Sequence, residues 1–175
     1  MAKELTEGMK NVARALIGDP PGTREKEELY RQVGRAVVRL SDTENLLAML
    51  FAICSLGSAD DAAEFFHQQF GFEKKLALVH FAMKGIAPKE GLVRWNKIYS
   101  VLSTHKGVRN LIAHQGMHVG APNERGEVIV LLKPPWLKKN SKGRELDVES
   151  IRSTADAITR AHGELWKLIG MLYEK

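Results

Sequence analysis

The sequence predicts an all-α fold, an up-and-down helical bundle of about five to six helices with a small β-hairpin insertion. Long segments carry apolar residues at steps of three and four, whereas one stretch, about residues 116–146, loses that period. The length of 175 residues and the 44% hydrophobic content suit one compact core. We therefore expect residues 1–175 to form a single helical domain, with the hairpin and a basic loop inserted at about 116–146.

The strongest helical pattern covers residues 27–56 and predicts a central helix. Beyond Leu46 the opposite face becomes apolar too, through Met49 and Ile53, as expected for a helix that enters the middle of a bundle. The residues that recur on the main stripe are Leu29, Val33, Ala36, Val37, Leu40, Leu47, Phe51 and Cys54.

Three further helices are expected before the hairpin. The first follows Ser58, an N-cap residue, and reaches about residue 69. Two acidic residues, Asp60 and Asp61, lie in its first turn. The others span residues 72–84 and 88–116, each closed by a glycine. The last of these carries the candidate site.

The hairpin is predicted from two short runs of strand-forming residues, Met117–Val119 and Glu127–Leu132. A loop at 133–144 follows, after which Asp147 is expected to cap a final helix ending near Tyr173. The turn between the two strands is expected at Pro122, Asn123 and Gly126.

Composition favours a cytoplasmic protein. Cys54 is the only cysteine, so one chain forms neither a disulfide nor a multi-cysteine zinc site. Residues 1–10 lack the apolar core of a signal peptide, and the apolar run 46–56 is too short to cross a bilayer, so no membrane partner is expected. The formal charge of +5 gives a modest preference for anionic partners.

The candidate catalytic residues lie in the segment Val108–His114. Arg109 and His114 are five positions apart, which on an ideal helix places their side chains about 140° apart. Convergence therefore needs an overwound last turn or a second copy of the helix across a two-fold axis. A guanidinium binds phosphate oxygens and an imidazole moves protons near neutral pH, so the pair suits phosphodiester cleavage without a metal or other cofactor. If the nucleophile is a ribose 2′-hydroxyl, the substrate is RNA.

Arg109, Asn110 and His114, with the small Ala113 before the histidine, resemble the Arg-polar-x-x-x-His signature of the HEPN (higher eukaryotes and prokaryotes nucleotide-binding) superfamily. The layout is similar as well, from Tyr30 to His114 and in the last helix. Its early long helix carries Gly34-Arg35-Ala36-Val37-Val38 and Thr43-Glu44-Asn45-Leu46-Leu47, and the signature comes late in a following helix.

The resemblance implies a homodimeric, metal-independent endoribonuclease. Arg109 and His114 of both protomers would line a cleft at the dimer interface, with Asn110 orienting them. Many members of the superfamily act as toxins or in defence against phage, which makes an antitoxin or regulatory protein a further expected partner. Others have lost activity, so the alternative is a catalytically silent helical module that dimerises and binds a nucleotide, RNA or a partner protein.

Two residues are candidates for support around this site. Glu44 lies on the apolar stripe of the central helix, where a buried carboxylate needs a partner. Arg109 is the expected partner, and the alternative is a partly exposed acid at the edge of the stripe. His105, four positions before Arg109, could line the same cleft or lie at the surface.

A basic loop is the candidate RNA-binding element, because its cations could grip phosphates while a tryptophan stacks on a base. The alternative is a solvated loop. The spacing of four between His114 and His118 matches metal ligands on a helix, but Gly116 is expected to end that helix, so no metal site is predicted. The residues of the loop are Lys133, Trp136, Lys138, Lys139, Lys142 and Arg144.

Overall fold

A computed structural model describes residues 22–55, 57–120, 128–133 and 145–174. The expected turn residues Pro122, Asn123 and Gly126 lie outside this described part, as do residues 134–144 of the basic loop. The side chain of Arg109 also lies outside it, although its backbone belongs to a helix.

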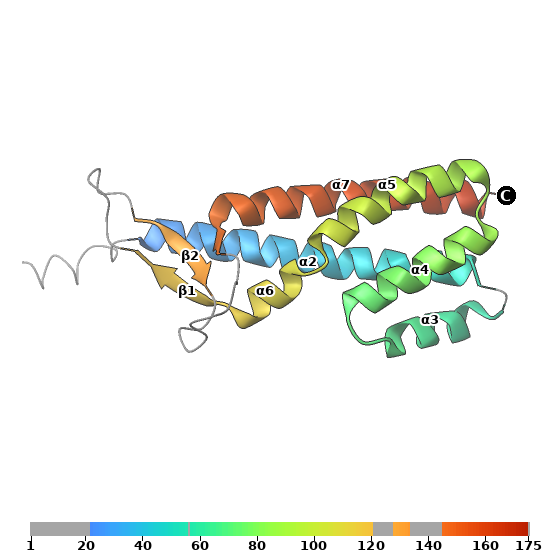
Figure 1. Ribbon diagram of the computed structural model, residues 1–175, viewed down its shortest axis with the longest axis horizontal. Coiled ribbons are helices and arrows are strands. Elements are labelled where there is room, and N and C mark those ends of the chain that lie inside the picture. The colour runs from blue at the N-terminus through green and yellow to red at the C-terminus, as the bar shows by residue number, and fades with distance from the viewer. Residues whose placement is uncertain (1–21, 56, 121–127, 134–144, 175) are drawn as a thin grey trace, which may run out of the picture.

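The described chain is a helical bundle with a small antiparallel sheet at one end, which confirms the predicted fold class. The two longest helices, α2 and α7, run side by side along the long axis, and α5 packs along α7 (Figure 1). Helices α3 and α4 pack on α2 at the end away from the sheet. The helices are α2 (Thr23–Ile53), α3 (Ala59–Gln68), α4 (Phe72–Ile86), α5 (Lys89–His105), α6 (Val108–His114) and α7 (Val148–Tyr173).

Both predicted N-caps are confirmed. The side chain of Ser58 accepts a hydrogen bond of 3.3 Å from the backbone N–H of Asp61, and Asp147 accepts one of 2.7 Å from the backbone N–H of Ser150. These bonds satisfy backbone donors that a helix start leaves without an internal partner. Local chemistry therefore sets where α3 and α7 begin.

The expected continuous helix over residues 88–116 is wrong. It is interrupted at Lys106 and Gly107, so that α5 ends at His105 and α6 begins at Val108. Glycine is a weak helix former, and the two segments pack on different neighbours, α5 on α7 and α6 on α2. The chain bends at this point, as Figure 1 shows.

The hairpin is confirmed in outline and extended by a strand that the sequence pattern missed. Strands β1 (Gly116–Val119) and β2 (Val130–Lys133) are antiparallel, with Met117 opposite Leu132. Strand β2 begins at Val130, later than the expected Glu127. The third strand, β3 (Leu146–Asp147), pairs with β2, and its two residues are too few to produce an alternating pattern.

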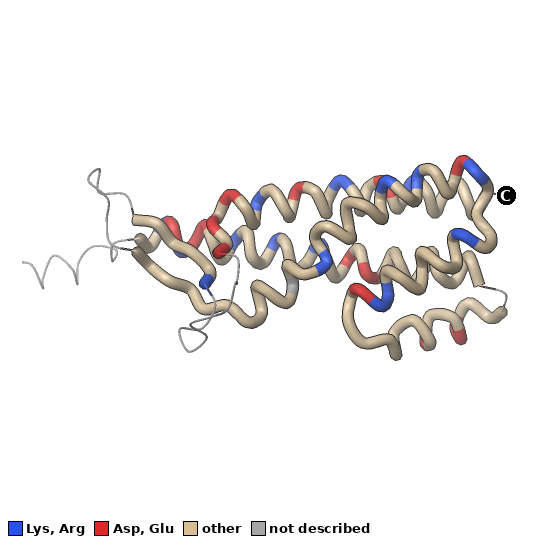
Figure 2. Tube along the Cα trace, in the orientation of Figure 1, with Lys and Arg blue, Asp and Glu red and all other residues tan. Residues whose placement is uncertain are grey.

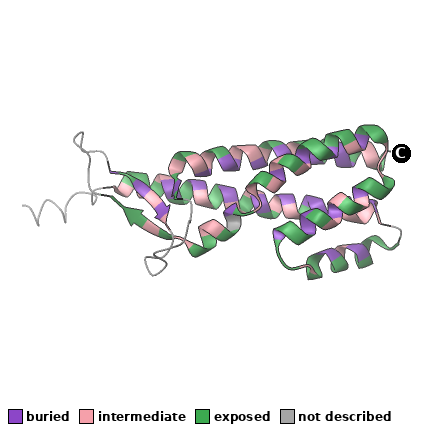
Figure 3. Cartoon of the chain, in the orientation of Figure 1, coloured by how far each residue is buried: buried purple, intermediate pink, exposed green. Residues whose placement is uncertain are grey.

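Two apolar clusters fill the part of the chain that the structure describes. The larger one lies among α2, α3, α4, α5 and α7, with the indole of Trp95 fully buried in it. The smaller one joins the sheet to the starts of α2 and α7, and Leu111 and Ile112 of α6 pack against it. Buried positions recur along the facing sides of α2 and α7, as the amphipathic period predicts (Figure 3).

Candidate functional site

Helix α6 presents two of the three candidate catalytic residues to solvent. Asn110 and His114 are four positions apart on α6, so their side chains lie on the same face of the helix, and both are exposed. Val108 is buried and Ile112 packs on the smaller cluster, so apolar contacts fix the opposite side of α6. The helix is thus held with a polar face outward.

His114 is the last residue of α6, and the chain turns into extended backbone at Gln115. Within the described ranges, no hydrogen bond or ion pair engages its imidazole. His118 follows on strand β1, so the two histidines belong to different elements, as expected from Gly116. Arg109 lies on the same helix, and the convergence of its side chain with His114 stays a prediction.

Asn110 borders a hollow of about 600 Å³, which we call the Phe70 hollow. One wall is the turn between α3 and α4, and the other is the bend between α5 and α6. Lys106 of the bend forms an ion pair with Glu73 of α4, and this pair ties the two walls together. The lining residues are Phe70, Gly71, Phe72, Glu73, Lys74, Ser103, Thr104, Lys106, Gly107 and Asn110.

The structure places His105 in a second hollow, of about 450 Å³, which Asn110 does not line. The two hollows share Thr104 and Gly107 at the bend. Asp147 and Glu149 also line the second hollow, and their negative charges oppose the binding of a phosphate there. A supporting role of His105 toward Arg109 stays a prediction.

Glu44 has an ion-pair partner that the sequence pattern missed, Lys75 of α4. The ammonium Nζ of Lys75 lies 2.5 Å from Oε1 of Glu44 and 5.3 Å from the ring centre of Phe66. Lys75 occupies the buried stripe of α4, between Phe72 and Leu76, and this position was the signal that could have revealed it. The expected contact of Glu44 with Arg109 stays a prediction.

Cys54 is buried at the end of α2, and burial raises the pKa of its thiol. Its sulfur lies 3.5 Å from the sulfur of Met83. A thiol in such surroundings packs in the core and is a poor nucleophile, because the reactive form is the thiolate. The candidate chemistry therefore stays with α6.

Of the expected RNA-binding loop, the structure describes Lys133, at the end of β2. Its ammonium lies 3.1 Å from Oε1 of Glu145, which is the residue before β3. Elsewhere on the described chain, acidic and basic residues alternate along α7, whereas α3 carries acidic residues and neither lysine nor arginine (Figure 2). The remaining loop residues, Trp136, Lys138, Lys139, Lys142 and Arg144, lie outside the described part.

Among the residues that the structure describes, no three His, Cys, Asp or Glu side chains gather as a metal ion would require. None of the described helices combines the length and the apolar character that a bilayer crossing needs. Neither a family model, nor a curated protein, nor a solved structure matches this chain. The resemblance to the HEPN superfamily accordingly rests on the motif in α6 and on the helical layout.

Proposed function

We propose that this chain is a metal-independent endoribonuclease of HEPN type that works as a homodimer. One observation carries the proposal: α6 holds Asn110 and His114 exposed on one face, while its other side is anchored in the apolar core. A helix anchored in this way, with an imidazole that no described group engages, is a suitable support for a group that must meet a substrate.

The proposed reaction is attack of a ribose 2′-hydroxyl on the adjacent phosphorus. The new bond joins the 2′-oxygen to phosphorus, and the bond from phosphorus to the 5′-oxygen breaks. His114 moves the proton between these oxygens, and Arg109 stabilises the charge that develops on the phosphate. Asn110 orients both groups. The products are a 2′,3′-cyclic phosphate and a 5′-hydroxyl, and DNA is inert because it lacks the nucleophile.

Two subunits are proposed because the spacing of Arg109 and His114 directs their side chains to different sides of one helix. A two-fold axis near α6 would bring the arginine of one subunit toward the histidine of the other. Sedimentation equilibrium tests this directly, with a particle of two chains as the expected result. A strict monomer that still cleaves RNA would overturn the composite site.

The activity is tested with labelled single-stranded RNA in the presence of a chelator. Wild-type protein should cleave the RNA, whereas His114→Ala and Arg109→Ala should each lower the rate by about 10² or more. His67→Ala is the matched control, because His67 is an exposed histidine on α3, and its rate should stay at the wild-type level. RNA with 2′-O-methyl groups should resist cleavage.

Two results would overturn the enzyme proposal. One is cleavage that His114→Ala leaves unchanged. The other is folded wild-type protein that cleaves no RNA, and binding without cleavage would then favour the alternative of a silent binding module.

A further inference from the structure

We infer that the Phe70 hollow is a nucleotide subsite, in which the ring of Phe70 stacks on one base of a single-stranded RNA beside Asn110. This inference rests on the proposed function, since it places part of the same RNA next to α6. It adds a substrate contact on α3–α4, which carries no residue of the Arg109–His114 motif.

Phe70 is the first observation. Its side chain is 87% exposed, although burying a phenylalanine ring stabilises a folded protein. It lies in the short turn between α3 and α4, where Gly71 adopts a positive φ of 85° that other residues rarely adopt. The ring thus stands open to solvent at the hollow, where an unstacked base can reach its face.

The polar lining is the second observation, and it favours a nucleotide over an apolar protein segment. Lys74 lines the hollow, and its ammonium has no hydrogen-bond or ion-pair partner among the described residues. Ser103, Thr104 and Asn110 supply hydroxyl and amide groups on the opposite wall. An aromatic ring next to a free cation and neutral polar groups is the combination that binds single-stranded nucleic acid.

The position of Asn110 is the third observation. It belongs both to the lining of the hollow and to the exposed face of α6 that carries His114. A nucleotide held by Phe70 and Lys74 would thus place a neighbouring phosphate toward the candidate catalytic helix. Stacking is tolerant of base identity, so the subsite would select single strands over duplexes, in which the bases are already stacked.

The experiment measures the affinity of the full chain for a fluorescein-labelled, 2′-O-methyl single-stranded RNA by anisotropy. Phe70→Ala should bind about 10-fold more weakly than wild type, and Phe70→Trp should bind as well as wild type. Phe81→Ala is the matched control, because Phe81 is 80% exposed on α4 but does not line the hollow, and its affinity should not change. On an abasic strand of the same length, wild type and Phe70→Ala should bind equally.

Several results would overturn the inference. Equal affinities of Phe70→Ala and Phe81→Ala would do so, as would a loss that persists on the abasic strand. A lower particle mass for Phe70→Ala would assign the ring to contact between subunits, and failure of the wild type to bind any RNA would remove the subsite. Cleavage that is independent of Phe70 would refute the subsite alone, whereas Phe70-dependent binding without cleavage would refute the enzyme alone.

Discussion

The ammonium of Lys75 on α4 lies 2.5 Å from the carboxylate of Glu44 on α2, and the lysine is only 8% exposed. Burial removes water from both charges, so the Lys75 ammonium depends on the Glu44 carboxylate for electrostatic compensation. The pair joins the central helix to the helix that forms one wall of the Phe70 hollow.

Removing one member of this pair should destabilise the fold. Glu44→Leu leaves the Lys75 ammonium buried without its carboxylate, and we expect a loss of about 3 kcal/mol in the free energy of unfolding. The double variant Glu44→Leu/Lys75→Met should recover most of that loss, because it removes the buried ammonium together with its carboxylate. Urea denaturation of the wild type and of the two variants measures these differences in the free energy of unfolding.

The exposed ion pair of Lys167 with Glu164 on α7 provides the control. The side chains are 66% and 51% exposed, so Lys167→Met should change the free energy of unfolding by less than about 1 kcal/mol. A double variant no more stable than Glu44→Leu would contradict the assignment of the Lys75 pair.

His80 should make the stability depend on pH in the mildly acidic range. The indole N–H of Trp95 donates to Nδ1 of His80 at 3.0 Å, so that nitrogen must be unprotonated. Desolvation by burial and the charge of Lys84 lower the pKa of His80 below its ordinary value of 6.5. The unfolded chain then binds a proton at His80 more readily than the folded chain does. The contribution of neutral His80 to stability is therefore complete above about pH 6.5 and is lost as the pH falls through the lower pKa of His80 in the folded protein.

The measurement for His80 is the free energy of unfolding at pH 7.5 and at pH 5.5. His80→Asn retains an acceptor for the indole but does not titrate, so its stability should fall less than that of the wild type on acidification. Equal falls for the two proteins would show that His80 does not couple to folding.

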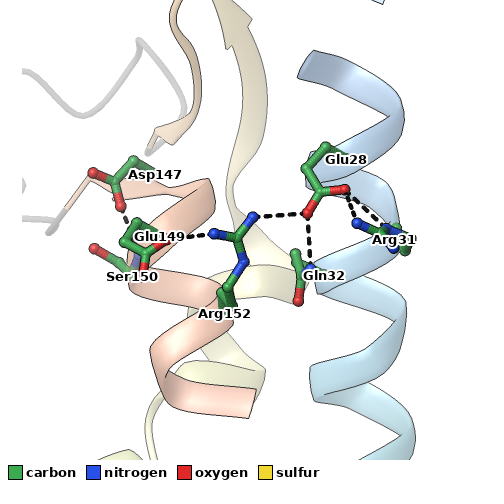
Figure 4. Close-up of polar contacts among 7 residues, drawn as sticks. All are labelled: Glu28, Arg31, Gln32, Asp147, Glu149, Ser150 and Arg152. Carbon is green, nitrogen blue, oxygen red and sulfur yellow. Dashed lines mark hydrogen bonds and ion pairs between the residues drawn. The ribbon is translucent and has the colours of Figure 1, made fainter. Parts of the chain in front are cut away.

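Glu28 should contribute to stability against stronger acid. Its carboxylate accepts hydrogen bonds from Gln32 and from Arg152 of α7, and Arg31 pairs with it as well (Figure 4). Together these bonds lower the pKa of Glu28 from 4.5 to about 2, with that from Gln32 having the largest effect. Its contribution is therefore present above about pH 4.5 and is lost as the pH falls toward 2.

Glu28→Gln removes this titration while preserving the shape of the side chain. The variant should be less stable than the wild type at pH 6, and the difference should shrink at pH 3. Denaturation curves at the two pH values give both free energies. A difference that stays constant with pH would mean that the carboxylate does not link α2 to α7 energetically.

Two glycines should respond in opposite ways to replacement by alanine. Gly107 has helical φ and ψ and open space around its Cβ position, so Gly107→Ala should raise the free energy of unfolding by about 0.4 to 1 kcal/mol. Gly71 also has open space, but its φ is 85°, so Gly71→Ala should lower the free energy by about 1 to 3 kcal/mol. Urea denaturation gives both values, and changes of the same sign would contradict the backbone assignment of one of them.

The sequence predicted those features that depend on neighbours along the chain. Apolar residues at steps of three and four positions revealed the long helices. The side chains of Ser58 and Asp147 marked two helix starts, which the structure confirms. The chemistry assigned to the segment from Arg109 to His114 also comes from residue type and spacing, and it stays a prediction.

Tertiary packing decided what the period leaves open. A helical stripe shows that a face is buried, but it does not identify the residues that lie against it, so the Lys75 partner of Glu44 and the interruption at Gly107 were missed. Phe70 meets Asn110 at one hollow only because the α3–α4 turn packs beside the α5–α6 bend, forty positions further along the chain. Contacts at such separations depend on how whole helices pack, and no local pattern encodes them.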